Sequence, residues 1–568
     1  MGSAGARWGR GGVRRSWTAA ALVVALVLTG GLVLPGANPA VATAGGGEAT
    51  VAAVPVVCDV SNLKLPVAVP FEVTPVAAAA GPGGLVVDVT GSFPQLPIVV
   101  TVNSITIAVP IPAGVESVDS VSFAGGDLAG TYSTSGDDLL VTFSGDARSD
   151  TVELPVATVT ATVASGTDPA SVHVGPFSRL ELSTGVGAAT CAPSDEPAPP
   201  PLTPPTPDTD PFYVPPPGFE DVPAGTVLRT RPARIRALGI GVPVNATQAL
   251  FRTDDTAGNP VVTVTTLLRS PMPYLRGDRP LVSYQVAIDS LGAACQPSHT
   301  YTEDAGLDIF LLLQLLLRGY DVAVPDYEGP RFAYGAGLML AHATLDGVRA
   351  VEALPGTGLA GPRTPVALWG YSGGAIASGW AAQLQPTYAP ELDLKAVALG
   401  GTPANLIATA RHMDGTLVSG FMLLVALAIS REYPYFSLAF NERGRALSTE
   451  LADACGGVVF KYGFRRLADY LVIPDPLTSP LVEAVMEQLT LGETAPTAPV
   501  FLYHAVHDEG IPFAEAVALK ADWCAAGANV TLYADHMSEH ILLPLVASWR
   551  AVAFIADRFN GTPTAVQC

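Results

Sequence analysis

The hydrophobic and polar positions change their pattern along the chain, and the first long pattern covers residues 45–193. Short apolar runs rich in Val and Thr alternate there with Gly, Pro and Asp, as in LVVDVTGSFPQLPIVVTVNSITIAVPIP, DLLVTFSG and VATVTATVASG. Such β-branched runs bounded by turn residues predict strands. Repeated strands without helical periodicity favour an all-β, sandwich-like module. We interpret it as a binding or spacer module whose ligand the sequence does not indicate.

The next pattern is proline-rich. APSDEPAPPPLTPPTPDTD extends from Ala192 to Asp210, and a proline density this high predicts extended, semi-rigid chain without a core of its own. We therefore place a linker at residues 194–209. It separates the β module from a second domain at residues 210–568.

Strands alternate with helical patterns in the second domain. The strand predictions are 280–288, 321–326, 366–370, 395–401, 499–506 and 528–534, and helices are predicted between them, for example over 307–318 and 337–354. This alternation predicts a parallel α/β sheet. Ligands of such sheets bind at the carboxyl ends of the strands, so the candidate chemistry should follow those ends.

The first 44 residues have the pattern of an export signal. Arginines precede the apolar run TAAALVVALVLTGGLVLPG, and the small residues Ala42-Thr43-Ala44 follow it. This arrangement predicts a signal peptide at residues 1–44 and a secreted product, extracellular or associated with the cell wall. An uncleaved membrane anchor is the alternative, which the glycines and the proline within the run disfavour.

Charge and cysteine content narrow the picture further. The net charge of −21 gives an acidic surface, which excludes nucleic acid as an expected partner. The six cysteines are an even number and fit disulfides in an oxidising compartment. They allow 15 connectivities, and their grouping along the chain favours three pairs: Cys58–Cys191, Cys295–Cys455 and Cys524–Cys568. No C-x-x-C spacing occurs, so no metal site is expected.

One short segment carries a nucleophile signature. In VALWGYSGGAIASGW, Gly370, Ser372 and Gly374 match G-x-S-x-G at the end of a predicted strand and the start of a predicted helix. This is the nucleophile elbow of α/β-hydrolases, in which the backbone N–H of the following residue, Gly373, helps to bind the oxyanion. A serine hydroxyl needs a base to take its proton and an acid to orient that base.

The acid and the base are expected after the serine, in the order acid and then histidine. Asp508 follows one predicted strand and His540 the next, in YHAVHDEGIPF and YADHMSEHI. Glu509 competes with Asp508, but neighbours on an extended chain point to opposite sides. His536 competes with His540 as the base. The remaining nearby histidines, His504 and His507, are interpreted as packing or supporting groups.

The second domain resembles the secretory lipase family, the lipase A type of yeasts with many actinobacterial relatives. The resemblance rests on DPFYVPPPGF, LVSYQVAIDSLGAACQPSH, PDYEGPRFAYGAGLMLAHATLDGVRA, GYSGGAIASGWAAQLQPTYAPEL and HDEGIPF…ANVTLY…SEHI, which occur here in the family's order. It implies an α/β-hydrolase fold with an inserted helical cap at about residues 404–495. It also implies a triad of Ser372, Asp508 and His540, with Asp289 as the second oxyanion donor beside Gly373. A carboxyl donates only when protonated, so burial must raise the pKa of Asp289.

These inferences predict a secreted serine esterase or lipase that acts on fatty-acid esters of the triacylglycerol type and needs no cofactor. The apolar stretch TLVSGFMLLVALAIS at 416–430 is either buried core or part of a cap that contacts a lipid surface. The alternatives are a small-ester carboxylesterase, another acyl hydrolase such as a peptidase, and an inactive surface-binding protein. Because the linker isolates the β module, we expect hydrolysis to survive its removal.

Overall fold

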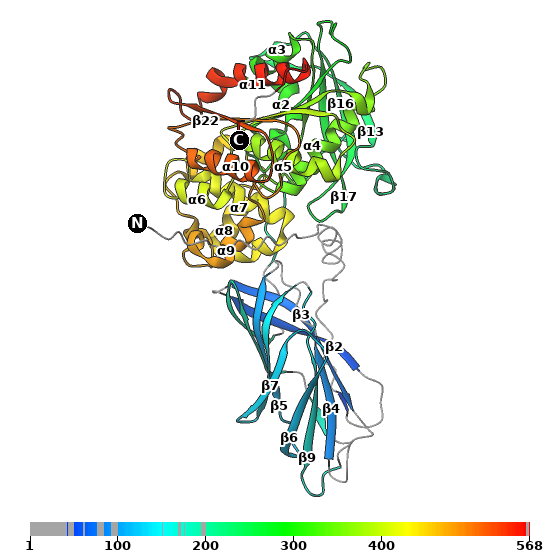
Figure 1. The fold of residues 1–568 in the computed structure, drawn as a ribbon, viewed down its shortest axis with the longest axis vertical. Helices are drawn as coiled ribbons and strands as arrows, with labels where there is room; N and C mark the ends of the chain where they lie inside the picture. The colour runs from blue at the N-terminus through cyan, green and yellow to red at the C-terminus, as the bar shows by residue number, and fades with distance from the viewer. Residues whose placement is uncertain are drawn as a thin grey trace, which may run out of the picture.

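The computed structural model describes residues 42–43, 50–60, 63–75, 84–91, 100–149, 151–168, 172–174, 177–194, 200–563 and 567–568. These residues form an N-terminal region of strands and a larger C-terminal region in which strands and helices alternate (Figure 1). The predicted signal peptide lies outside the described residues, except for Ala42 and Thr43. No helix within the described ranges combines the length and the hydropathy needed to cross a bilayer.

Ten N-terminal strands are hydrogen-bonded into one antiparallel sheet in the order β6-β9-β4-β3-β2-β12-β11-β5-β8-β7, and β1 pairs separately with β10. We call the ten-stranded sheet the N-terminal module. The strands are β1 Ala42–Thr43, β2 Thr50–Val60, β3 Leu63–Pro75, β4 Gly84–Gly91, β5 Thr101–Pro110, β6 Val115–Ala124, β7 Ala129–Ser135, β8 Asp138–Arg148, β9 Val156–Val163, β10 His173–Val174, β11 Arg179–Thr184 and β12 Gly187–Pro193. The region is rich in β-structure as expected, and a sandwich arrangement of the single sheet stays a prediction.

The C-terminal region is built on a nine-stranded sheet in the order β13-β16-β17-β19-β18-β20-β21-β22-β23. Its strands are β13 Val227–Ala233, β16 Asn245–Asp254, β17 Pro260–Arg269, β18 Leu281–Gln285, β19 Asp321–Pro325, β20 Val366–Tyr371, β21 Leu394–Gly400, β22 Val500–Ala505 and β23 Val530–Asp535; β14 Arg236–Ala237 pairs with β15 Ile240–Gly241. From β19 to β23 the strands are parallel. All six predicted strands are present, and the antiparallel strands β13, β16 and β17 are additional.

Helices cover both faces of this sheet. They are α2 Pro297–Glu303, α3 Asp308–Leu316, α4 Gly337–Glu352, α5 Gly373–Tyr388, α10 Phe513–Ala525 and α11 Leu543–Phe559. Alternate residues of β20 point to opposite faces: Leu368 packs in the core shared with α4, α5 and α10, whereas Trp369 packs in the core shared with α3 and α11. In a parallel sheet that is buried on both faces, each strand has a continuous apolar sequence. These strands could therefore be predicted from the sequence.

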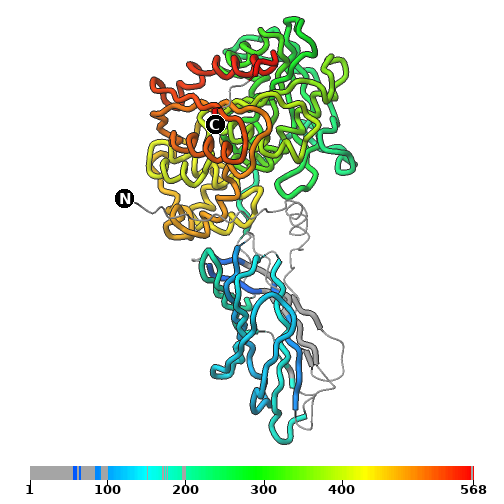
Figure 2. Tube along the Cα trace, in the orientation of Figure 1, coloured from blue at the N-terminus to red at the C-terminus, as the bar shows by residue number. Residues whose placement is uncertain are grey.

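A helical insertion, residues 401–499, separates β21 from β22. It contains α6 Leu406–Met413, α7 Gly420–Glu432, η5 Pro434–Ala439, α8 Glu442–Glu450, η6 Gly456–Tyr462, η7 Leu467–Tyr470, η8 Pro476–Thr478 and α9 Pro480–Glu487. The insertion lies between the nine-stranded sheet and the N-terminal module, both in the ribbon of Figure 1 and in the Cα trace of Figure 2, which has the same orientation. It includes the interval predicted for the cap, residues 404–495.

Three disulfides connect the pairs expected from the sequence. Cys58–Cys191 joins β2 to β12, Cys295–Cys455 joins the segment after β18 to the insertion, and Cys524–Cys568 joins α10 to the C-terminal residues. The predicted pairing is therefore confirmed. Each bridge lies within the half of the chain to which it was assigned.

Candidate active site

Ser372 lies in the sharp turn between β20 and α5. Its backbone has φ 53° and ψ −123°, a conformation that is unfavourable for a residue with a side chain and is typical of strained functional turns. Glycine is required at the two flanking positions because other backbone atoms lie too close for a side chain. A Cβ atom on Gly370 would lie 2.2 Å from the carbonyl oxygen of Gly374, and one on Gly374 would lie 2.0 Å from that of Gln285.

Ser372, His540 and Asp508 form one line of hydrogen bonds. His540 Nε2 lies 2.9 Å from Ser372 Oγ, and His540 Nδ1 lies 2.7 Å from Asp508 Oδ2. Asp508 follows β22 and His540 follows β23, so adjacent parallel strands deliver both groups to the same edge of the sheet. The structure thus brings together the three residues that the sequence singled out.

The electrostatics of this line suit proton transfer. Burial opposes the ionisation of Asp508, but hydrogen bonds from His504 and His540 outweigh it and hold the pKa of that carboxyl well below its usual value. Burial alone would lower the pKa of His540, whereas its hydrogen bond to Asp508 and the charge of that carboxylate raise it. The acid is therefore ionised, and it favours the protonated imidazole.

The competing residues occupy other places. The side chain of His536 is exposed, and no described contact joins it to Ser372 or Asp508. His504 is buried, with Nε2 at 3.3 Å from Asp508 Oδ2 and 3.0 Å from the carbonyl oxygen of Ile511. Glu509 accepts a hydrogen bond of 3.0 Å from the backbone N–H of His540. Asp508 thus binds the imidazole of His540, and Glu509 binds the backbone N–H of the same residue.

Asp289 lies beside the N-terminus of α5. A Cβ atom on Gly373 would lie only 2.0 Å from Asp289 Oδ1, so the carboxyl rests directly against that backbone. Gly373 is the first residue of α5, where helix geometry leaves the N–H without an intrahelical partner. Asp289 Oδ1 is buried without a hydrogen-bond partner. Burial raises the pKa of Asp289 to about 6, although the Tyr334 hydroxyl and His540 act in the opposite direction.

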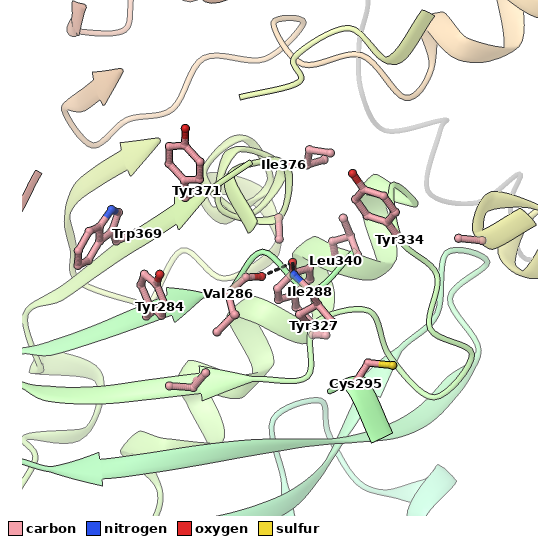
Figure 3. Close-up of a cluster of buried hydrophobic side chains, with 14 of the residues drawn as sticks. Tyr284, Val286, Ile288, Cys295, Tyr327, Tyr334, Leu340, Trp369, Tyr371 and Ile376 are labelled. Carbon is pink, nitrogen blue, oxygen red and sulfur yellow. Dashed lines mark hydrogen bonds between the residues drawn. The ribbon is translucent and has the colours of Figure 1, made fainter. Parts of the chain in front are cut away.

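The loop that carries Asp289 is held from behind by residues that follow β19. The Tyr327 hydroxyl donates a hydrogen bond of 2.5 Å to the carbonyl oxygen of Val286 (Figure 3). Ser290 donates to Glu328 from its hydroxyl, at 3.0 Å, and from its backbone N–H, at 3.3 Å. Asp289 itself has φ 46°, so this loop fixes a backbone conformation that non-glycine residues seldom adopt.

A cavity of about 820 Å³ opens at the serine. Ser372, His540 and Asp289 line it on the sheet side, and apolar side chains of the insertion line most of the remainder. Tyr284, Tyr334 and Tyr371, which Figure 3 places around the elbow, also belong to its wall. A reactive hydroxyl at the wall of a long apolar cavity suits a substrate with a reactive carbonyl and a hydrocarbon chain.

Sequence reasoning identified the three residues of this hydrogen-bonded line but not the residues that support them. Tyr334 contacts Asp289, and Glu328 holds the loop of Asp289; neither belongs to a motif that reveals this contact. The role of Glu509 as acceptor for the His540 backbone was also not predicted. Only its position beside Asp508 brought it into consideration.

The chain matches known proteins over the whole C-terminal region. A family model described as secretory lipase matches residues 295–567. A probable inactive lipase of Mycobacterium tuberculosis is 38% identical over 63% of this chain and 83% of its own length, and a secreted triacylglycerol lipase of Malassezia furfur is 35% identical over 64% and 78%.

Among solved structures, Candida antarctica lipase A superposes with a TM-score of 0.58 at 29% identity, covering 63% of this chain and 87% of that one. The family model, at residues 295–567, lies entirely within the C-terminal region. The C-terminal region has an α/β-hydrolase fold, and the chain belongs to the secretory lipase family.

Proposed function

We propose that this protein is a secreted serine hydrolase that cleaves carboxylic esters of fatty acids, with triacylglycerols as the substrate class. The observation that carries the proposal is the hydrogen-bonded line from Ser372 Oγ through His540 to Asp508 at the wall of an apolar cavity. Membership of the secretory lipase family supports ester hydrolysis, and relatives named as secreted lipases support export.

The first half-reaction forms an acyl-enzyme. Ser372 Oγ attacks the ester carbonyl while His540 Nε2 takes its proton, and Asp508 stabilises the resulting imidazolium. The tetrahedral oxyanion is bound by the Gly373 N–H and by the protonated carboxyl of Asp289, whose unpartnered Oδ1 faces that backbone. Each such donor contributes about 3 kcal/mol to transition-state stabilisation. His540 then gives the proton to the leaving alcohol.

The second half-reaction restores the enzyme. Water attacks the acyl carbonyl, His540 takes the proton of the water, and the same two donors stabilise the second oxyanion. Collapse of that intermediate breaks the bond to Ser372 Oγ, which recovers its proton from His540. The fatty acid leaves through the apolar cavity.

The insertion acts as the cap that binds the acyl chain and contacts the lipid surface. Several lining residues are exposed as well as apolar, which gives the mouth of the cavity a non-polar rim. They are Leu307, Leu417, Phe460, Ile541, Leu542 and Leu545. Exposed apolar groups gathered around one opening mark a contact surface rather than scattered surface residues.

The test uses the secreted chain and its Ser372→Ala variant with p-nitrophenyl esters and an emulsified triacylglycerol. We expect hydrolysis of both by the wild type, and labelling by a fluorophosphonate that the variant loses. The Mycobacterium tuberculosis relative is described as a probable inactive lipase, so the labelling experiment matters as much as turnover. Hydrolysis of acetate esters alone would support a small-ester carboxylesterase, and neither labelling nor hydrolysis would support a binding protein.

A further inference from the structure

Two leucines of the N-terminal module line the cavity that holds Ser372. Leu63 and Leu65 stand at the start of β3, and their side chains are 7% and 5% exposed. Lys64, between them, is exposed, as expected for a strand in which successive side chains point to opposite faces. One face of this strand is therefore directed into the cavity.

These leucines meet the insertion at a defined junction. There the backbone N–H of Val472 donates a hydrogen bond of 2.8 Å to the carbonyl oxygen of Ala439, so two segments of the insertion lie side by side. Six residues both line the cavity and pack in the core of the module. They are Leu63, Leu65, Ala439, Ile473, Leu481 and Val482. The cavity therefore reaches from Ser372, along side chains of the insertion, to this junction; the insertion lies between the sheet and the module (Figure 1).

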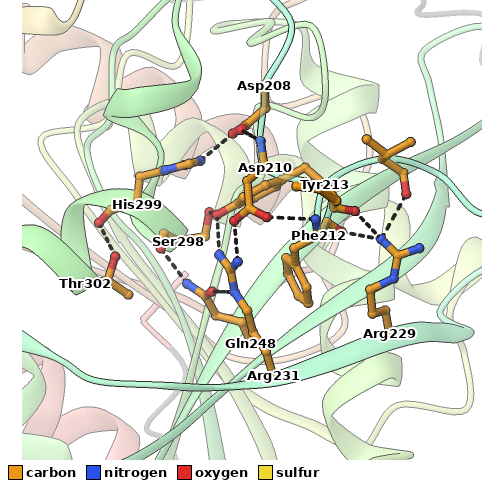
Figure 4. Close-up of polar contacts among 12 residues, drawn as sticks. Asp208, Asp210, Phe212, Tyr213, Arg229, Arg231, Gln248, Ser298, His299 and Thr302 are labelled. Carbon is orange, nitrogen blue, oxygen red and sulfur yellow. Dashed lines mark hydrogen bonds and ion pairs between the residues drawn. The ribbon is translucent and has the colours of Figure 1, made fainter.

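The described part of the linker also binds the C-terminal region. Thr203 Oγ1 lies 2.7 Å from Thr449 Oγ1 of α8, and Thr206 Oγ1 donates a hydrogen bond of 2.6 Å to Asp453. Asp208 lies 2.7 Å from His299 within the polar network of Figure 4. The sequence predicted a detached module, but these contacts and the apolar junction place it against the insertion.

We propose that the start of β3 closes the far end of the acyl cavity, so that Leu63 and Leu65 limit the length of the acyl chain that fits. This inference rests on the proposed function, because it assigns the cavity to an acyl chain. Each methylene that enters an apolar cavity improves binding about fourfold. The gain ends where the chain meets a packed wall, because overfilling a core is unfavourable.

The experiment compares the full secreted chain with a Leu63→Ala/Leu65→Ala variant and a Leu65→Trp variant. The readout is the ratio of kcat/KM for C16 to that for C4 p-nitrophenyl esters, which does not depend on the fraction of folded enzyme. We expect Leu65→Trp to lower this ratio at least tenfold. The double alanine variant should move the preferred chain length upward by two or more carbons.

Leu85→Ala is the matched control. Leu85 is also a buried leucine of the module core, but it does not line the cavity. β3 pairs with β4 from Phe71–Gly91 to Pro75–Val87, so Leu85 lies past the far end of β3, away from the junction. Its substitution should leave the ratio unchanged.

Direct binding separates this inference from the proposed function. Fluorescent fatty acids of 12 to 18 carbons are titrated into the Ser372→Ala protein with and without Leu65→Trp. Selective loss of affinity for the longest acids supports the inference even if the wild type hydrolyses no ester. Superimposable affinities and rate ratios in all variants would overturn it, whatever the catalytic activity.

Discussion

At the scale of single residues, Ser372 and Asp289 share an unusual property: both have a positive φ, 53° and 46°, outside the regions that side-chain-bearing residues prefer. The two residues meet across the backbone of Gly373. Strain at two touching positions is maintained only where the surrounding structure fixes both. The proposed nucleophile and oxyanion donor are thus positioned before substrate arrives.

The identity of the catalytic base can be tested by replacing each of two histidines, which lie four residues apart, with alanine. We expect His540→Ala to reduce kcat/KM about as much as Ser372→Ala does, because members of a triad act as a unit. His536→Ala should keep most activity, since its side chain is exposed. The measurement is ester hydrolysis with circular dichroism as the folding control. A folded, inactive His536→Ala beside a fully active His540→Ala would reverse the assignment.

The acid can be tested in the same assay. Asp508→Ala should reduce turnover severely, because the imidazole loses both its orienting partner and the charge that stabilises its protonated form. Glu509→Ala should have a mild effect, because it removes only an acceptor for the His540 backbone N–H. Equal losses in the two variants would show that both carboxylates serve the base.

The proposed oxyanion donor predicts a pH effect with a definite sign. Asp289 donates only when protonated, and its pKa is raised to about 6, so its contribution is present below that pH and declines as pH rises through it. Asn donates at every pH and tolerates a positive φ. The ratio of Asp289→Asn to wild-type kcat/KM should therefore increase from pH 6 to pH 9. A constant ratio would exclude titration of Asp289 from the mechanism.

Single residues also show which parts of the candidate site could be predicted from the sequence. Ser372, Asp508 and His540 could be found because each follows a strong apolar strand. Tyr334 and Glu328 could not, because their partners in the Asp289 loop lie about 40 residues away in sequence and no local pattern encodes that contact. The sequence therefore indicated which three residues form the hydrogen-bonded line better than it indicated the residues that hold their surroundings.

At the scale of elements, α5 approaches β18 so closely that Gly374 cannot carry a side chain. A Cβ atom there would lie 2.0 Å from the carbonyl oxygen of Gln285. We expect Gly374→Ala to lower Tm by several degrees, because either the helix or the strand must move. Gly457→Ala, whose Cβ would have nothing within 4 Å, is the control. Equal Tm values for the two variants would contradict the packing.

Glu328, which accepts hydrogen bonds from Ser290 in the Asp289 loop, predicts a second effect on stability. Burial raises the pKa of Glu328 from its ordinary 4.5 to about 8. Between these values the unfolded chain has lost a proton that the folded chain retains, so stability decreases as pH rises. Glu328→Gln should give a Tm that falls less between pH 5 and pH 8 than the wild-type Tm, as measured by calorimetry. An unchanged slope would show that Glu328 does not control it.

The elements that escaped prediction are instructive. β16 and β17 pair antiparallel with each other and enter the nine-stranded sheet before the first βα unit. NATQALFRTD and PVVTVTTLLR contain polar residues at buried positions, such as Gln248 and Thr263, whose side chains are hydrogen-bonded. A search for continuous apolar runs misses such strands because polar residues interrupt them. These polar residues can be buried because hydrogen bonds in the folded state satisfy part of their polar groups.

At the scale of the whole molecule, Cys295–Cys455 ties the region after β18 to the insertion across 160 residues of sequence. Closing so long a loop restricts the unfolded chain, and native disulfides typically contribute about 2–5 kcal/mol. A Cys295→Ser/Cys455→Ser variant should have a clearly lower Tm under oxidising conditions. Addition of a reductant should then lower the wild-type Tm more than that of the variant.

The relation between the two halves was the least predictable feature. A proline-rich segment ordinarily indicates a spacer, and nothing in Leu63 or Leu65 distinguishes them from other apolar residues of a strand. The buried core that contains them also contains Ile473, about 410 residues away in sequence. Only tertiary structure reveals that the first domain contributes to the cavity of the second.

The Cys58–Cys191 bridge lies directly behind the proposed wall, because Cys58 pairs with Leu65 in the ladder between β2 and β3. Cys191 lies two residues before the end of β12, from which the chain continues into the linker that binds α8. The proposed wall is therefore connected to the insertion in two ways: directly through the apolar junction, and indirectly through the bridge and the linker. A movement of the insertion away from the serine would either break the apolar junction or move the module together with the insertion. Admission of a lipid by such a movement would then involve the ten-stranded sheet as well as the helices of the insertion.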